Sequence, residues 1–155
     1  MTDQAGTASP TARELLERAQ QLFLKKDLNS FADMFTEDGI HELPFAPPGV
    51  PVTIQGREKI REYFSLITVT PIEFHEFVDL TIYEATDPNV VIAEYTAKGV
   101  IVSSGEPYTT RYIQVLQARD GEVAVWRDYW NPLSGATAMG RLPQLFKALT
   151  GQDLS

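Results

Sequence analysis

Cysteine is absent from this sequence of 155 residues. No disulfide can therefore form, and cysteine-based metal sites and thiol nucleophiles are excluded. A domain of this length buries roughly 68–70% of the surface that its unfolded chain exposes, so its fold needs no covalent staple. The lack of cysteine fits a reducing compartment, and we expect the protein to be cytoplasmic.

Long apolar runs and basic clusters are also missing. No stretch approaches the roughly 20 apolar residues of a membrane span, and residues 1–10 have neither the basic region nor the apolar core of a signal peptide. The net charge is -8, whereas nucleic acids and anionic membranes attract clustered lysine and arginine. We expect no nucleic-acid partner and no membrane partner. Residues 1–10 are predicted to be a disordered tip, and residues 11–150 a single domain.

Motifs for metal, phosphate and serine chemistry do not occur. The two histidines, His41 and His75, stand in no H-x-H, H-x-x-x-H or H-E-x-x-H spacing. There is no G-x-S-x-G stretch, no P-loop and no G-x-G-x-x-G stretch. We therefore expect no metal site and no cofactor.

The first half of the chain has helical patterns. Thr11 and Glu14 form a T-x-x-E capping box in front of an apolar stripe at helical spacing. Gly39 is predicted to close a second helix, and four prolines indicate an irregular loop after residue 43. The predicted elements are helices over residues 11–26, 27–35 and 56–67 and a short strand over residues 40–45.

After residue 71 the pattern changes to a period of two residues, which indicates strands. Short connections join them, among them the Asp120-Gly121 pair that is typical of a tight hairpin. Such connections favour an antiparallel meander over βαβ units. The predicted elements are strands over residues 73–84, 90–102, 108–118 and 123–131 and a final helix over residues 142–149.

Helices followed by a long sheet indicate an α+β fold. A long sheet on a small core must curl over its helices, and the mouth of the curl is a natural place for a small-molecule cavity. We predict a strongly curved antiparallel sheet, packed on three N-terminal helices, around an apolar pocket.

The last predicted strand carries the first candidate site. Alternate residues of a strand share a face, so Trp126, Asp128 and Trp130 lie on one side. If that side points inward, a carboxylate between two tryptophans loses water, and desolvation raises its pKa toward the range useful for acid–base catalysis. Alternatively, Asp128 pairs with an arginine at a sheet edge and the tryptophans belong to the core.

The neighbouring strand carries two more candidates on one face. Tyr112 and Gln114 are predicted to offer a phenol and an amide to a bound oxygen. The alternative is that Tyr112 fills the core with its hydroxyl at the rim. Phe45, in the proline-rich loop, joins Trp126 and Trp130 as a candidate substrate-binding residue.

Both histidines are candidate catalytic residues. His41 precedes the proline-rich loop, and it is a candidate proton shuttle near neutral pH if its strand lines the pocket mouth. A solvated histidine beside a glutamate is the alternative. His75 shares a strand face with Glu73 and has the same two interpretations.

Three stretches resemble a known family: FTEDGIHELPFAPPG, GREKIREYF and WRDYWNPL. In this order they are similar to the SnoaL-like group of the nuclear-transport-factor-2-like superfamily, which includes ketosteroid isomerase, scytalone dehydratase and limonene epoxide hydrolase. The likeness is greatest to the phenazine biosynthesis proteins A and B and covers residues 12–140. It implies a cone-shaped α+β barrel and a homodimer through the outer face of the sheet.

The resemblance also implies roles for single residues. In the phenazine proteins a glutamate of the last strand is the acid/base on a cyclic amino-ketone, and Asp128 holds the matching position with a side chain one methylene shorter. Tyr112 matches a pocket tyrosine of that family. His75 lies in about the region of a pocket histidine, and His41 falls where other SnoaL-like members line the cavity.

The resulting expectation is a cofactor-independent acid/base enzyme of secondary metabolism. Its substrate is expected to be small, cyclic and carbonyl-bearing, and the reaction an isomerisation, cyclisation, condensation or dehydration. Epoxide hydrolysis is a less favoured expectation. This reaction uses an Asp-Arg-Asp set, of which only Asp128 and Arg127 are recognised in the sequence, and these two residues lie on opposite faces of one strand. The alternative is a small-molecule-binding protein or a dimeric scaffold without turnover.

Overall fold

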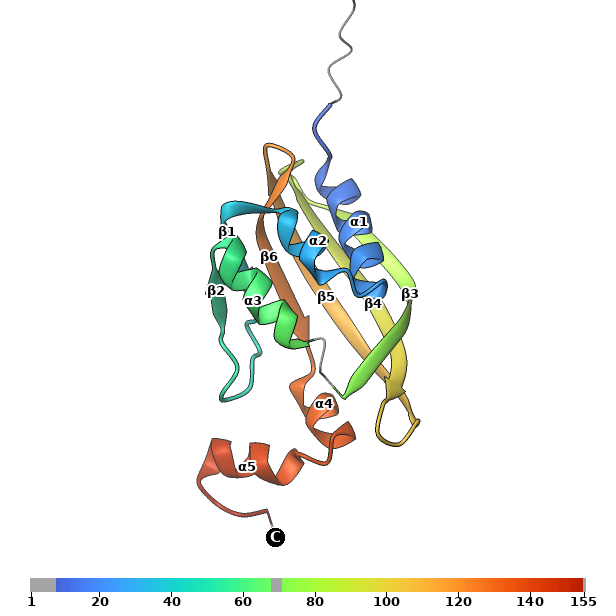
Figure 1. Ribbon diagram of the computed structural model, residues 1–155, viewed down its shortest axis with the longest axis vertical. Coiled ribbons are helices and arrows are strands. Elements are labelled where there is room, and N and C mark those ends of the chain that lie inside the picture. The colour runs from blue at the N-terminus through green and yellow to red at the C-terminus, as the bar shows by residue number, and fades with distance from the viewer. Residues whose placement is uncertain (1–7, 68–70, 155) are drawn as a thin grey trace, which may run out of the picture.

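A curved sheet forms the body of the molecule (Figure 1). The structure is a computed structural model that describes residues 8–67 and 71–154. Within these residues the strands are β1 (Phe35–Glu42), β2 (Thr53–Gln55), β3 (Ile72–Glu84), β4 (Val90–Ile101), β5 (Pro107–Arg119) and β6 (Glu122–Trp130). They form one sheet in the order β2-β1-β6-β5-β4-β3. The predicted α+β fold with a curved sheet is confirmed.

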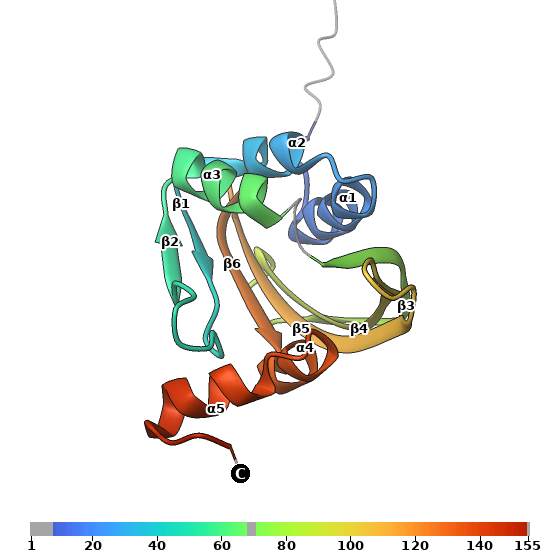
Figure 2. The same ribbon diagram turned by 60° about the horizontal axis from the view of Figure 1, so that its bottom comes forward.

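Five helices in the described ranges accompany the sheet. They are α1 (Ala12–Leu24), α2 (Leu28–Asp33), α3 (Arg57–Ile67), α4 (Pro132–Ala138) and α5 (Leu142–Thr150). Figure 2 shows α1, α2 and α3 across one end of the curl, and α4 and α5 beyond the end of β6. The predicted capping box begins α1: Thr11 accepts from the backbone N–H of Glu14, and the Glu14 carboxylate accepts from the backbone N–H of Thr11.

The core lies between the three N-terminal helices and the concave face of the sheet. Leu16, Ile60, Phe35, Leu116 and Val123 are fully buried there, and they come from α1, α3, β1, β5 and β6. These large side chains fill the end of the curl that the helices cover. The other end is left for a cavity.

Two local features shape the meander of β3 to β6. Asp120 and Gly121 have φ values of 53° and 79°, which fit the primed turn of a two-residue hairpin and confirm that prediction. Gly99 lies where β4 approaches β3 closely, because a Cβ at this position would meet the carbonyl oxygen of Glu73 at 2.0 Å. Only glycine allows this approach.

β1 begins earlier than the sequence predicts. The polar run Glu37-Asp38 before Gly39 is typical of a helix end, but α2 ends at Asp33 and the run belongs to the strand. The register between β1 and β6 shifts between Phe35 and Ile40, so the run bulges out of the ladder. A Cβ on Gly39 would lie 2.9 Å from the carbonyl oxygen of Thr36, so the glycine serves this bulge and does not close a helix.

The sheet is mixed, not purely antiparallel as expected. β1 pairs with β6 in parallel, and His41 stands opposite Trp126. Arg127 Nε donates to Glu42 at 2.5 Å across the same pair of strands. The meander of β3 to β6 is antiparallel as predicted. The parallel pair joins segments that lie far apart in the chain, so no local pattern in the sequence predicts this pairing.

The remaining differences concern short elements. β2 lies after the proline-rich loop and was not predicted, because three residues carry too little periodicity. α4 was not predicted either; Asn131 caps it and Pro132 occupies its first turn. Residues 1–7 of the predicted tip lie outside the described residues, and residues 8–10 have no regular structure. Where the chain is described, no helix combines the length and the apolar character needed to cross a bilayer.

Candidate functional site

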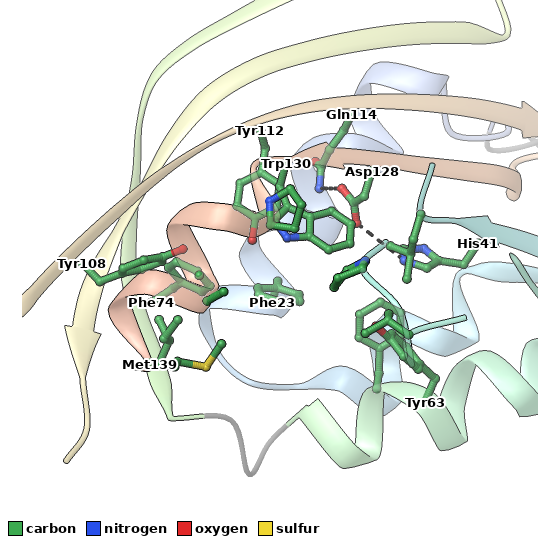
Figure 3. A pocket seen from close by; sticks show the side chains of 18 of the residues that line it. Phe23, His41, Tyr63, Phe74, Tyr108, Tyr112, Gln114, Asp128, Trp130 and Met139 are labelled. Atoms are coloured by element: carbon green, nitrogen blue, oxygen red, sulfur yellow. Dashed lines mark hydrogen bonds and ion pairs between the residues drawn. The ribbon is translucent and has the colours of Figure 1, made fainter. Parts of the chain in front are cut away.

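A cavity of about 560 Å³ occupies the open end of the curl. Figure 3 shows side chains from both the sheet and the helices pointing into it. Its described walls are mostly aromatic and apolar. The aromatic members are Phe23, Phe31, Tyr63, Phe64, Phe74, Phe77, Tyr95, Tyr108, Tyr112, Trp126 and Trp130.

Asp128 is the carboxylate of this cavity. Gln114 Nε2 donates a hydrogen bond of 2.6 Å to its Oδ1, because Gln114 on β5 stands directly opposite Asp128 on β6. The carboxylate is 14% exposed, so it is largely desolvated but still reaches the cavity. Burial raises the pKa of Asp128 to about 6, although the hydrogen bond from Gln114 and the nearby indole of Trp126 act in the opposite direction.

His41 lies beside Asp128 but is not hydrogen-bonded to it. Its Nε2 is 3.6 Å from Asp128 Oδ2, and neither ring nitrogen has a hydrogen-bond partner among the described residues. The imidazole is 1% exposed and packs edge-on against the ring of Phe64, with 5.1 Å between centroids. Burial lowers the pKa of His41 to about 3, so the ring is neutral at physiological pH.

Tyr112 faces the cavity from β5, opposite Trp130 on β6. Its ring stacks on Tyr95 with centroids 5.5 Å apart and planes 19° apart. Burial raises the pKa of Tyr112 and of Tyr95, with a further contribution from the negative charge of Asp128. Both phenols are therefore neutral and can act as hydrogen-bond donors.

The structure brings most of the predicted residues together. Trp126, Asp128 and Trp130 all line the cavity, as the strand alternation predicts. Tyr112 and Gln114 join them from β5, and His41 from β1. The catalytic and binding roles assigned to these residues remain predictions.

Two predicted residues lie elsewhere. The side chain of His75 is 53% exposed and its Nε2 is 3.4 Å from Glu73, because His75 alternates along β3 with Phe74, which faces the cavity. Phe45 is 57% exposed and packs against Tyr129, with 5.3 Å between ring centroids. Tyr129 alternates with Asp128 and so lies on the outer face. Neither His75 nor Phe45 is among the lining residues.

Several lining residues were missed. Tyr95 pairs with Tyr112 across β4 and β5, so extending the alternation rule to one more strand would have found it. Gln20 interrupts the apolar stripe of α1, and a polar residue at a buried position was the available signal. Arg141 and Gln144 lie at the start of α5 and carried no signal in the sequence. Among the described residues, no three His, Asp or Glu side chains are grouped as a metal site would need.

Comparison with known proteins decides the family. Residues 16–141 match the family model described as the SnoaL-like domain. The chain belongs to the SnoaL-like family. The predicted resemblance is thus confirmed, and the match covers most of α1, all of α2, α3 and α4, and the whole sheet.

Relatives of this SnoaL-like protein include phenazine-related sequences. An uncharacterized PhzA/B-like protein of Pseudomonas aeruginosa is 35% identical over 144 residues, which are 90% of this chain and 98% of the relative. The phenazine biosynthesis protein PhzB of Pseudomonas fluorescens is 27% identical over 111 residues, which are 70% of this chain and 68% of PhzB. The predicted likeness to the phenazine A/B proteins is confirmed.

A solved structure confirms the fold of the SnoaL-like protein. The crystal structure of a candidate isomerase from Bacillus subtilis superposes with a TM-score of 0.78 at 36% identity, and the match covers 84% of this chain and 93% of that one. The expected homodimer, small-molecule partner and cytoplasmic location stay predictions.

Proposed function

We propose that this SnoaL-like protein is a cofactor-independent enzyme in which Asp128 transfers a proton on a small cyclic, carbonyl-bearing substrate. One observation carries the proposal: a carboxylate with a pKa raised to about 6 by burial reaches into an aromatic cavity of about 560 Å³. A carboxyl group with a pKa close to the working pH is effective both as a base and as an acid.

The chemistry would proceed in two proton transfers. Asp128, ionised at neutral pH, accepts the proton of a C–H bond next to the carbonyl group, and the electron pair of that bond moves to the carbonyl oxygen. The neutral Tyr112 phenol, which lines the same cavity, would donate a hydrogen bond to that oxygen. In an isomerisation, the protonated Asp128 then returns the proton to another carbon of the enolate. In a cyclisation, the enolate carbon first attacks a second carbonyl carbon of the substrate, the π electrons of that carbonyl move to its oxygen, and Asp128 gives its proton to the resulting alkoxide.

His41 would not act as a base in this scheme. Its buried, neutral ring lies 3.6 Å from Asp128 Oδ2. We propose that it excludes water from the carboxylate and keeps a positive charge away, which holds the pKa of Asp128 high. The names of the relatives support a biosynthetic or isomerase activity, since one is a phenazine biosynthesis protein and another a candidate isomerase.

A second candidate is small-molecule binding, or a dimeric scaffold, without turnover. The described lining residues include one carboxylate in a largely aromatic cavity, which favours this candidate, because the neighbouring His41 is not within hydrogen-bond reach of that carboxylate. In this case the cavity would recognise a planar apolar ligand and Asp128 would only orient it.

Proton abstraction can be tested without knowing the substrate. 5-Nitrobenzisoxazole is a planar probe: when a base removes its ring C–H proton, the N–O bond breaks and a nitrile and a coloured phenolate form. We expect the wild-type rate to rise with pH through about pH 6, and Asp128→Asn to lower the rate at pH 8 by about 100-fold. Glu73→Gln, which removes an exposed carboxylate, is the matched control.

Two outcomes would contradict the enzyme. Full activity in Asp128→Asn would remove Asp128 as the base. Binding of the probe, detected as a rise in melting temperature, without any turnover by the wild type would favour the binding protein instead.

A further inference from the structure

The charges of the cavity wall are few and separated. Among the described lining residues only Asp128 and Arg141 carry a formal charge, since His41 is neutral. Asp128 lies inside the curl on β6. Arg141 lies between α4 and α5, beyond the end of that strand.

Arg141 has no ion pair with any residue in the ranges 8–67 and 71–154. This is unusual for the molecule, because six of the other seven arginines have a carboxylate partner: Arg13, Arg57, Arg61, Arg111, Arg119 and Arg127. The remaining one, Arg18 on α1, does not line this cavity. Arg141 is therefore the one cation of the described wall, and no carboxylate of the described residues pairs with it.

The face of α5 explains how Arg141 reaches the cavity. The lining residues from this segment are Arg141, Gln144, Leu145 and Ala148. Their spacing is i, i+3, i+4 and i+7, which is one face of a helix. The polar pair lies at the start of α5 and the apolar pair one turn later, so a guanidinium and an amide stand together at this part of the wall.

The aromatic residues lie between the two charges. Figure 3 shows His41 and Asp128 at one end of the site, Tyr112 and Trp130 in the middle, and Tyr108 and Met139 at the other end. Met139 is two residues before Arg141. A ligand that reaches both ends must therefore pass between aromatic rings.

We propose that Arg141, with Gln144 beside it, binds a carboxylate group of the substrate at the outer end of the cavity. This rests on the proposed function, in which Asp128 acts on the inner end. An anionic group at the inner end would be repelled by ionised Asp128, whereas the planar guanidinium of arginine pairs with a carboxylate through two parallel hydrogen bonds. The substrate class is then a planar, mostly apolar acid whose carboxylate is remote from the reacting carbon.

Matched probes test this assignment. 2-Naphthoate and 2-naphthamide have the same ring system and nearly the same shape, but only the first is charged. Their affinities are measured by isothermal titration calorimetry. Quenching of tryptophan fluorescence serves as a second readout, because both tryptophans of the chain line the cavity. We expect the wild type to bind 2-naphthoate about tenfold more tightly than 2-naphthamide, as for a charge-assisted hydrogen-bonded pair.

Three variants locate the preference. Arg141→Gln is expected to lower the affinity for 2-naphthoate to that for 2-naphthamide and to leave the latter unchanged. Arg141→Lys should keep part of the preference, since it keeps the charge but loses the planar fork. Arg18→Gln removes the other arginine that has no ion pair within the described ranges, and it should change neither affinity. Equal binding of the two probes by the wild type, a preference that survives in Arg141→Gln, or no binding of either probe at millimolar concentration would overturn the proposal.

The result can be separated from that of the proposed function. Asp128→Asn is titrated with the same two probes. If the carboxylate preference depends on Arg141 but Asp128 is not needed for proton abstraction, the proposed role of Asp128 is wrong and the carboxylate site stands. If Asp128 is required for proton abstraction while the preference is absent, the carboxylate site alone is wrong.

Discussion

Each histidine of this protein lies beside a carboxylate, but the two pairs occupy opposite environments. His41 and Asp128 are 3.6 Å apart with side chains 1% and 14% exposed, whereas His75 and Glu73 are 3.4 Å apart with side chains 53% and 41% exposed. In the first pair burial moves the pKa of both groups in the direction that leaves them uncharged. In the second pair the pKa of Glu73 is lowered, chiefly by its hydrogen bond with Lys26.

The two pairs show that proximity alone does not make an acid–base site. At the edge strand β3, water and Lys26 stabilise the ionised carboxylate, and the pair is an ordinary surface feature. Inside the curl, the same two chemical groups lack water, and the carboxylate becomes able to take and return a proton near neutral pH. The two carboxylates therefore differ in pKa because the sheet encloses Asp128 and leaves Glu73 exposed.

The largest effect is expected from removing the buried ring. His41→Ala should lower the free energy of unfolding by about 2–4 kcal/mol, because it leaves a void among packed aromatic rings. His75→Ala should change it by less than about 0.5 kcal/mol, as is usual at exposed positions. Urea unfolding followed by tryptophan fluorescence measures both. Equal losses would show that the two environments do not differ as described.

The next effect is a gain of stability in Asp128→Asn that depends on pH. The folded protein holds the pKa of Asp128 at about 6, above the ordinary 3.8. Ionisation of Asp128 therefore lowers the free energy of unfolding as the pH rises from about 4 to above 6. The difference of about two pH units corresponds to about 2–3 kcal/mol. Asp128→Asn should therefore be more stable than wild type by that amount at pH 8 and equally stable at pH 3.5.

Glu73→Gln is the control for this pH dependence. The lowered pKa of Glu73 gives the opposite sign: its small contribution is present above the unfolded pKa and disappears as the pH falls. Thermal unfolding of the three proteins at several pH values measures the effect. A pH-independent difference between wild type and Asp128→Asn would contradict the assigned burial effect.

The smallest effect concerns Gln114. Its amide N–H groups stabilise the ionised form of Asp128, so Gln114→Leu should raise the pKa of Asp128 further, by about one pH unit. The midpoint of the pH–rate profile with the benzisoxazole probe would move by the same amount. Gln117→Leu, an exposed change on the same strand, should leave the midpoint in place, and a shift in both variants would argue against a direct role of Gln114.

Local signals in the sequence predicted most of the fold. Of the pair His41 and Asp128, they predicted the position of Asp128 only. The capping box of α1 and the Asp120-Gly121 hairpin depend on neighbouring residues only, and both were predicted. The alternation around Asp128 placed Trp126 and Trp130 on its face.

The rest depends on contacts between distant segments. His41 meets Asp128 only because β1 adds to the sheet beside β6, in parallel, with the bulge before Ile40 setting its register. Each histidine has a glutamate close to it in the sequence, so the local sequence does not distinguish the two. The curl of the sheet decides which imidazole ring is buried. Phe45 was misplaced for the same reason, since its loop folds against the outer face of β6.

The parallel pairing of β1 with β6 also has a consequence for how the chain acquires its site. During synthesis β1 leaves the ribosome long before β6, so its inner edge stays unpaired until residues 122–130 have been made. Pairing across so long a separation is slow, because the intervening chain must be closed into a loop first. His41 and Asp128 therefore come together only when nearly the whole domain has folded, and incomplete chains have no assembled site.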